Sequence, residues 1–479
     1  MVPRNSVPED KKILTTTWNF KVKQHPNGIV SRYKARLCAR GFLQVPGQDF
    51  HDTFAAVAKL PSFRALVSVA AARDLELLHL DVKTAFLHAD VEEEIYVHPP
   101  QGLDVDKDKV LRLLKALYGL RQASRQWNKT IHRILLKLGF TQSEADPCLY
   151  VYSDGDVFML IYVDDILIAH IKGFDIDSLI ATLGEHFDIG SKEELHYFIG
   201  IQIVRDRANR KISLLQSRYI EDVLHRFNMQ DCNPAPTPAV LSSQPLSEGG
   251  PLDKVDHATY RSLVGAVLWV AVATRIDIQL AVSLLTQHVH QPTTRALTAA
   301  KRVLRFLKAT QDECLTFKGA ELQLIGQCDA SWGNHHPTRR SYHVFSFSLN
   351  GGAISWSTKL QPIVALSTVE AEYIALCATA QEATWLRKLC KFLRVPIDSA
   401  TPTVISQDNE GARQLTENPV HHRRTKHIDI KYHFTRGCVQ RKEIQLQHVS
   451  SDNLAADLLT KILPKATFLR HAASLLHGS

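Results

Sequence analysis

The sequence has 479 residues, which is enough for two or three domains with separate hydrophobic cores. Hydrophobic residues make up 45% and charged residues 22%, a composition that excludes an intrinsically disordered chain. The formal net charge of +8 indicates either a polyanionic partner or simply a basic protein, and charge alone does not separate the two.

Cysteine spacing and short motifs exclude further classes. The eight cysteines are scattered without a Cys-x-x-Cys pair, so neither a zinc finger nor a disulfide framework is expected, and we expect reduced thiols inside a cell. No run of 18 apolar residues and no signal-peptide core occur, so the sequence indicates neither a membrane protein nor a secreted one. Neither GxxxxGK[ST] nor GxGxxG is present, which excludes a P-loop or Rossmann enzyme.

The first part of the chain, up to about Asn233, alternates basic, apolar and turn segments as mixed α/β structures do. Residues 121–140 carry apolar side chains at helical spacing, at Trp127, Ile131, Leu135 and Leu138. Basic side chains at steps of four follow the opposite face, at Arg125, Lys129, Arg133 and Lys137. This stripe is either a solvated helix face or a track for a phosphate backbone.

Residues 158–169, FMLIYVDDILIA, place two adjacent carboxylates inside an apolar, β-branched run. The pattern predicts a tight hairpin with Asp164 and Asp165 at its turn. An exposed Asp-Asp turn is the alternative, but a buried carboxylate is costly unless it is paired or binds a metal. A third carboxylate, Asp81, ends a short apolar strand at a second place in the chain. Two-metal phosphoryl transfer needs carboxylates from separate strands around ions about 3.5–4 Å apart, and these three residues can supply them.

Residues 233–250, NPAPTPAVLSSQPLSEGG, have the composition of a linker, and we predict a domain boundary there. A largely helical stretch follows, and a last α/β region begins near Leu322. In this region three short strands or helices carry Asp329, Asp408 and Asp457. Ser367 and Glu370 fit an S-x-x-E capping box at a helix start, which leaves Glu372 as the better candidate ligand. Helix and strand caps are the alternative explanation for each acid.

Several segments, in this order along the chain, carry a family resemblance: RYKARLCARGF, LDVKTAF, EEEIYV, KALYGLRQASRQW, YVDDILIA, ELHYFIGIQI, QSRYI, AVATRIDI and AAKRVLRFLKAT. Together they resemble the reverse transcriptase and RNase H portion of copia-type LTR retrotransposon Pol polyproteins. The resemblance implies an α+β right-hand polymerase with fingers, palm and thumb in residues 1–240. It also implies a linker and helical connection in residues 241–320 and an α/β RNase H-like domain in residues 321–479.

The resemblance assigns roles to residues near the first three carboxylates. Asp81, Asp164 and Asp165 would be metal ligands on the palm. Phe86 would stack against the sugar of the incoming nucleotide and exclude a ribose 2′-hydroxyl, unless it is simply a core residue. The remaining nucleotide-binding candidates are two cations that suit a triphosphate and three residues of a substrate-contacting loop, namely Lys34, Arg36, Tyr118, Gly119 and Gln122.

In the last region the resemblance implies the acidic quartet of an RNase H, with Asp329, Glu372, Asp408 and Asp457 binding two Mg²⁺ ions. Mg²⁺ is the expected cofactor at both sites, with Mn²⁺ as a substitute. The expected substrates are RNA template, DNA primer, deoxynucleoside triphosphates and RNA–DNA hybrid, the last recognised by shape and by 2′-hydroxyls. Location in cytoplasmic particles or the nucleus is implied by resemblance alone, and the oligomeric state stays open.

Departures from the family pattern suggest a second hypothesis. The chain starts late in the fingers, and a role of residues 425–429 and of His433 or His448 in substrate handling is only a guess. Val344 stands where the family has a turn glycine, a position expected to need positive φ. The alternative to an active polymerase–nuclease is therefore a catalytically decayed remnant that only binds nucleic acid. All seven carboxylates are present, which favours activity.

Overall fold

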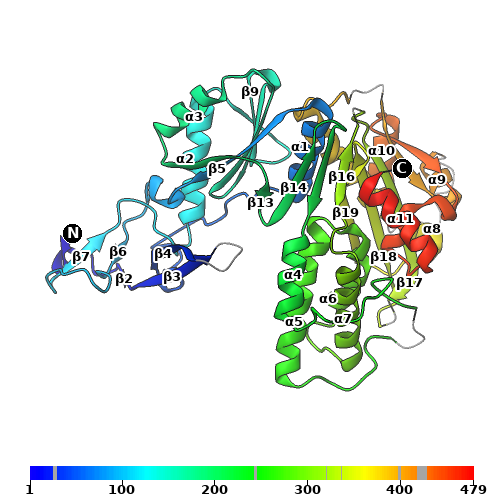
Figure 1. Ribbon diagram of the computed structural model, residues 1–479, viewed down its shortest axis with the longest axis horizontal. Coiled ribbons are helices and arrows are strands. Elements are labelled where there is room, and N and C mark those ends of the chain that lie inside the picture. The colour runs from blue at the N-terminus through cyan, green and yellow to red at the C-terminus, as the bar shows by residue number, and fades with distance from the viewer. Residues whose placement is uncertain are drawn as a thin grey trace. The chain divides into compact units, whose positions relative to one another are not determined.

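The computed structural model describes residues 1–24, 30–241, 245–319, 321–335, 337–397, 401–417 and 429–478. The chain divides into two compact units. Unit 1 comprises Met1–Ala58, Leu78–Ser143 and Pro147–Glu194; unit 2 comprises Lys59–Leu77, Glu144–Asp146 and Leu195–Ser479. Both units combine helices with sheets (Figure 1), which confirms a mixed α/β chain. Among the described residues, no helix is both long and apolar enough to cross a membrane.

The centre of unit 1 is a six-stranded sheet of order β12-β5-β11-β10-β9-β8. Its strands are β5 (Glu76–Val82), β8 (Thr141–Gln142), β9 (Leu149–Tyr152), β10 (Val157–Tyr162), β11 (Asp165–His170) and β12 (Ile189–Glu194). Apolar side chains of these strands share one core with α2 (Ala123–Lys137) and α3 (Ile176–Gly184). The predicted amphipathic helix is confirmed, because α2 buries Trp127, Ile131 and Leu135.

The basic stripe of α2 has partners of its own. Arg125 pairs with Asp52 at 3.0 Å, and Lys129 pairs with Glu92 at 2.7 Å. Half of the four cations are therefore neutralised within unit 1, which favours the solvated helix face over a phosphate track.

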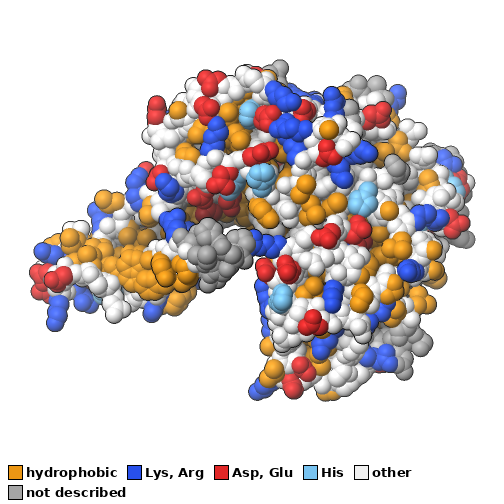
Figure 2. Space-filling model, in the orientation of Figure 1, with side chains coloured by type: hydrophobic (Ala, Val, Ile, Leu, Met, Phe, Trp, Pro, Cys, Tyr) orange, Lys and Arg blue, Asp and Glu red, His pale blue; other side chains and the backbone are white. Residues whose placement is uncertain are grey.

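The N-terminal part of unit 1 holds two small sheets. One has the order β1-β7-β6-β2, from β1 (Val2–Pro3), β2 (Ile13–Leu14), β6 (Tyr96–Val97) and β7 (Lys109–Arg112). The other is the antiparallel pair of β3 (Thr16–Gln24) and β4 (Val30–Ala39). Figure 2 shows hydrophobic side chains gathered over the first of these sheets. On β3 the aromatic Phe20 is 75% exposed, so this part of unit 1 carries apolar surface.

Unit 2 begins with a four-stranded sheet of order β13-β14-β15-β16 and a group of helices. The strands are β13 (Tyr197–Phe198), β14 (Ile201–Asp206), β15 (Lys211–Leu215) and β16 (Leu315–Lys318); the helices are α1 (Leu60–Arg73), α4 (Ser217–Arg226), α5 (Lys254–Ala273), α6 (Gln279–Thr286) and α7 (Thr294–Ala309). The predicted helical stretch is confirmed. The described part of the predicted linker has no helix or strand, and it packs on α7 through the N–H of Ala235, which donates to the Arg305 carbonyl at 3.1 Å.

The second sheet of unit 2 is mixed, with the order β19-β18-β17-β20-β21. Its strands are β17 (Ile325–His335), β18 (Arg340–Leu349), β19 (Gly352–Leu360), β20 (Thr403–Gln407) and β21 (Ile444–His448). The first three pair antiparallel, whereas β17–β20 and β20–β21 pair parallel. The helices here are α8 (Thr368–Phe392), α9 (Glu410–Glu417), α10 (Asp429–Gln440) and α11 (Lys465–His477). The last change from unit 1 to unit 2 along the sequence comes after Glu194. This division does not test the predicted domain boundaries at residues 240 and 320, which stay a prediction.

The expected turn at Val344 is wrong. Val344 lies inside β18, is fully buried and pairs with Asp329 of β17. Its φ is not among the positive values of the chain. A β-branched residue suits this buried strand position, so valine brings no strain here.

Helix α1 is anchored in unit 2 by one buried guanidinium. Arg64 donates from Nε to the Ile354 carbonyl at 2.8 Å, and from Nη1 to the carbonyls of Val272 at 2.8 Å and Ala273 at 3.0 Å. Its guanidinium carbon lies 3.8 Å from the centre of the Trp356 ring. Burial lowers the pKa of Arg64 to about 9. The Arg64 side chain therefore joins α1 to two segments that are distant from it in sequence, at residues 272–273 and at Ile354.

Candidate active sites

The predicted hairpin at residues 158–169 is confirmed. Strands β10 and β11 pair antiparallel up to Tyr162 and Asp165, so Val163 and Asp164 alone form the turn. Val163 has φ +60°, a left-handed conformation that a β-branched residue rarely adopts. The hairpin thus presents Asp164 in a strained two-residue turn and Asp165 at the first position of β11.

Two hydrogen bonds fix this turn. The indole Nε1 of Trp127, on α2, donates to the Val163 carbonyl at 2.6 Å. The N–H of Val82 donates to the Asp164 carbonyl at 3.0 Å. Because Val82 follows Asp81 on β5, the second bond ties the turn to the strand that carries the third predicted carboxylate.

The three predicted carboxylates lie close enough to interact electrostatically. Burial raises the pKa of Asp164, and the charges of Asp165 and Asp81 raise it further. Strand β12 approaches Asp81 at Gly190, where a Cβ atom would lie 2.9 Å from Asp81 Oδ2. Glycine at position 190 therefore leaves the room that this carboxylate occupies.

His79 is a neighbour of this site that the sequence analysis missed. Its Nε2 lies 2.8 Å from Asp165 Oδ1, and this hydrogen bond raises the pKa of His79. Residues two apart on a strand face the same side, so His79 shares a face with Asp81. The spacing of two residues between His79 and Asp81 was the sequence signal that could have identified His79.

Three of the predicted nucleotide-binding residues lie together beside the carboxylates. The rings of Phe86 and Tyr118 are 4.8 Å apart between centroids, and the Arg36 guanidinium carbon lies 4.9 Å from the Tyr118 ring. Burial raises the pKa of Tyr118, and Asp164 adds to that effect. Phe86 is half-buried and also contacts the core of unit 1, so both predicted roles fit its position.

The other three predicted nucleotide-binding residues, Gly119, Gln122 and Lys34, do not belong to this group of rings. Gly119 has φ +92°, and a Cβ there would lie 2.1 Å from the Ala39 carbonyl oxygen, so only glycine fits beneath β4. Gln122 is fully buried, and its amide donates to the Asp49 carbonyl at 2.8 Å. Gln122 therefore positions the loop rather than facing solvent. Lys34 lies on β4 opposite Lys21.

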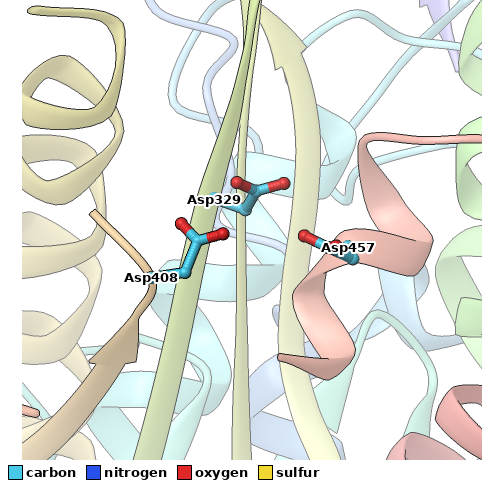
Figure 3. A group of neighbouring side chains, drawn as sticks. All are labelled: Asp329, Asp408 and Asp457. Atoms are coloured by element: carbon cyan, nitrogen blue, oxygen red, sulfur yellow. The ribbon is translucent and has the colours of Figure 1, made fainter. Parts of the chain in front are cut away.

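The second group of predicted carboxylates converges from three elements. Asp329 lies on β17, Asp408 follows β20, and Asp457 lies in a 3₁₀ turn at Ala455–Leu459. Each offers one carboxylate oxygen, and these oxygens lie within 4.8 Å of one another. Figure 3 shows the three side chains pointing toward one another.

Glu372 approaches the same group from α8. It is 6% exposed, and burial followed by the charges of Asp329 and Asp408 raises its pKa to about 9. Its Oε2 has no hydrogen-bond partner among the described residues. The predicted cap is confirmed, because the Ser367 hydroxyl accepts from the Glu370 N–H at 3.2 Å.

Two further residues at this site escaped the sequence analysis. Lys461 Nζ lies 2.9 Å from Asp457 Oδ1 and 3.5 Å from Asp329 Oδ2. The hydroxyl of Thr460 donates to Asp329. Burial raises the pKa of Asp329 to about 7 although Lys461 opposes the shift. The spacing of four between Asp457 and Lys461 was a weak signal for this ion pair.

Asp408 has neighbours from the segment after β21. The Ser451 hydroxyl donates to its carboxylate, and His448 Nε2 lies 3.2 Å from its backbone carbonyl. His448 therefore lies beside the acidic group, whereas His433 is exposed on α10. Residues 425–428 lie outside the described residues.

The donor set fits a hard divalent cation. Carboxylate oxygens are the ligands that Mg²⁺ and Mn²⁺ prefer. Buried acids with raised pKa values repel one another, and a bound dication would stabilise their charged forms. Among the described residues, the group of Asp329, Asp408 and Asp457 is the one whose ligand atoms converge this closely.

Comparison with known proteins identifies the family of this chain. The profile of the family described as reverse transcriptase (RNA-dependent DNA polymerase) matches residues 4–241. The retrovirus-related Pol polyproteins of transposon TNT 1-94 from Nicotiana tabacum and transposon RE1 from Arabidopsis thaliana are each 38% identical, over 96% and 98% of this chain. A transposon Ty5-1 protein of Saccharomyces cerevisiae is 33% identical over 63% of this chain and its own full length.

A strand-turn-strand pair of aspartates in a mixed α/β chain with this profile defines a reverse transcriptase domain. More specifically, the chain belongs to the retrovirus-related Pol polyproteins of copia-type transposons. It spans about a third of the length of the plant relatives it matches.

Proposed function

We propose that the chain is an RNA-directed DNA polymerase with RNase H activity, using two divalent ions at each of two carboxylate sites. The observation that carries the proposal is the hairpin turn, which presents Asp164 and Asp165 beside Asp81. The ring pair of Phe86 and Tyr118 adjoins these acids and supports a nucleotide site. In this proposal unit 1 contributes fingers and palm.

At the polymerase site, Asp81, Asp164 and Asp165 would hold the ions. When bound, the two ions activate the primer 3′-hydroxyl and neutralise the leaving pyrophosphate. Arg36 lies where its charge can bind a triphosphate. The half-buried Phe86 ring would contact the sugar and exclude a 2′-hydroxyl by its volume. Gly119 would keep Tyr118 close to β4.

At the second site, Asp329, Glu372, Asp408 and Asp457 would hold two ions for hydrolysis of the RNA strand of a hybrid. The order of the mixed sheet and the position of α8 support an RNase H-like domain at residues 321–479. The orphaned Oε2 of Glu372 supports a cation at the fourth carboxylate. Water attack on the scissile phosphorus would release a 5′-phosphate and a 3′-hydroxyl.

The substrates follow from these two reactions. They are RNA template, DNA primer, deoxynucleoside triphosphates and the RNA–DNA hybrid that polymerisation makes. The competing proposal of a decayed remnant loses one argument, because Val344 fits its strand position without strain.

Primer extension on an RNA template tests the proposal. The purified chain is assayed with Mg²⁺, with EDTA, and as the Asp164→Asn/Asp165→Asn variant, and we expect extension only by the parent chain with Mg²⁺. Extension by the double variant would overturn the metal assignment. No extension by a folded parent chain that still binds hybrid would favour the remnant.

A further inference from the structure

Three titratable side chains of unit 2 form a group that belongs to neither carboxylate site. Glu313 and Cys314 lie between α7 and β16, whereas His477 is the last residue of α11. His477 Nε2 lies 3.0 Å from Glu313 Oε2, and the Cys314 thiol forms a hydrogen bond with the His477 side chain. The fold thus brings together side chains that are 164 positions apart in the sequence.

The order of this group is sulfur, imidazole and carboxylate. In such an arrangement the imidazole accepts the proton of the nucleophile, and the carboxylate orients the imidazole and stabilises its protonated form. His477 also ends a 13-residue helix, where the partial negative charge of the helix favours a protonated side chain. The hydrogen bonds with Cys314 and Glu313 raise the pKa of His477 to about 9. The bond with His477 lowers the pKa of Glu313, and the charge of Arg275 adds to that effect.

Two hydroxyls complete the surroundings of the sulfur atom. Cys314 Sγ lies 3.4 Å from Thr316 Oγ1, and Ser213 of the neighbouring strand β15 also forms a hydrogen bond with the thiol. Burial raises the pKa of Cys314, but the bonds with the imidazole and the two hydroxyls outweigh burial, so the pKa is lowered overall. These bonds therefore stabilise the thiolate, which is the reactive form of cysteine.

Other cysteines of unit 2 have the opposite character. Cys328, Cys377 and Cys390 are buried, and burial raises the pKa of each thiol, that of Cys390 to about 12. Cys314 is only half-buried, and the side chains of its partners His477 and Glu313 are 39% and 43% exposed. Cys314 thus combines a stabilised thiolate with access from solvent, the two conditions for a reactive thiol.

We propose that Cys314 is a modification site whose thiolate reacts with hydrogen peroxide, with His477 as proton carrier and Glu313 as the residue that positions His477. His477 first takes the thiol proton. The sulfur then attacks one peroxide oxygen, so that an S–O bond forms, the O–O bond breaks and the sulfur gives two electrons to the peroxide. The other oxygen leaves as hydroxide and takes the proton from His477 to become water. The product at Cys314 is a sulfenic acid.

The alkylation rate of each thiol tests the reactivity of Cys314. The full chain is treated with iodoacetamide at pH 7, and each cysteine is followed by mass spectrometry. An ordinary cysteine is only about 3% thiolate at this pH, so Cys314 should react between ~5-fold and ~30-fold faster than the half-buried Cys232. The rate at Cys314 should also level off at a lower pH. Equal rates at the two cysteines would overturn the proposal.

A histidine variant tests the proton carrier. His477→Gln keeps a hydrogen-bonding side chain but cannot accept the thiol proton, so the rate at Cys314 should fall to that at Cys232. The matched control is His225→Gln, at an exposed histidine in the last turn of α4, which should leave the rate unchanged. The buried Cys390 reports unfolding in the same samples, because only an unfolded chain exposes it. An unchanged rate at Cys314 in folded His477→Gln would contradict the assignment of His477.

The product is tested with hydrogen peroxide in the presence of dimedone, a reagent that traps sulfenic acids. The dimedone adduct should form at Cys314 in excess over the half-buried Cys38 and Cys232. It should be absent from Cys314→Ser and reduced in His477→Gln. Absence of the adduct from a parent chain whose Cys314 alkylates rapidly would overturn the peroxide assignment.

Discussion

The two carboxylate sites accommodate negative charge in different ways. Asp165 remains 37% exposed in its side chain and bonds to His79, whereas Asp329 is 1% exposed beside Lys461. In the more exposed site, burial raises the pKa of Asp164, and the charges of Asp165 and Asp81 raise it further. In the buried site, the pKa of Asp329 reaches about 7 and that of Glu372 about 9. Burial is the largest cause of these raised pKa values, so a bound cation would stabilise the charged carboxylates of the buried site in particular.

The largest expected effect tests whether the two sites work independently. Asp164→Asn should lower primer extension at least ~100-fold, because loss of outer partners alone already costs about 10–100-fold. Hybrid cleavage should stay within about twofold of the parent. Asp329→Asn should do the reverse. Both activities are measured on the same preparations, and loss of both in either variant would contradict independent sites.

A smaller effect is expected from the ring beside the exposed site. Phe86→Ala should reduce the preference for deoxynucleotides over ribonucleotides by at least ~10-fold, a factor typical of one steric contact. Competitive incorporation measures this ratio. Phe86→Tyr keeps the ring and serves as control. An unchanged ratio in the alanine variant would mean that Phe86 is only a core residue.

The buried site should make stability depend on pH. The pKa of Asp329 and that of Glu372 lie above their unfolded values, so the folded chain binds more protons than the unfolded chain between about pH 4 and those values. The free energy of unfolding in EDTA should therefore fall as pH rises from about 5 to about 9. Mg²⁺ should raise the melting temperature more at the alkaline end, as measured by calorimetry.

The Asp329→Asn/Glu372→Gln variant is the control for this measurement, since it lacks both titrating groups. Its melting temperature in EDTA should vary less with pH. An equal slope in parent and variant would place the pH dependence elsewhere.

The smallest effect concerns the loop of the exposed site. Gly119→Ala should destabilise the chain by about 1–3 kcal/mol, because φ +92° and the nearby Ala39 carbonyl both disfavour a side chain. The KM for deoxynucleotides should rise as Tyr118 is displaced. Chemical denaturation and steady-state kinetics measure the two effects, and Gly102→Ala, at positive φ but with open space, isolates the backbone contribution.

Local features of the fold could be predicted from the sequence. The hairpin of Asp164 and Asp165, the amphipathic helix α2 and the Ser367 cap depend on patterns within a few residues. Physical rules for strand alternation, helix period and capping act at that range. The convergence of Asp329, Asp408 and Asp457 could be expected only from a family resemblance.

The features that escaped prediction depend on pairing between distant segments. His79 contacts Asp165 because β5 lies beside β11, and Lys461 contacts Asp329 because its turn lies against β17. The expectation for Val344 failed because a family glycine was read as a turn, whereas the position lies within a strand. Membership of α1 in unit 2 likewise follows from packing that no local pattern encodes.

The anchor at Arg64 limits where such a chain can be cut or recombined. A fragment that ends within residues 233–250 would keep α1 and lose the carbonyls of Val272, Ala273 and Ile354. A buried guanidinium without acceptors is strongly destabilising. Expression of either half alone, or exchange of halves between related elements at this segment, is therefore disfavoured unless the partner segments are inherited together.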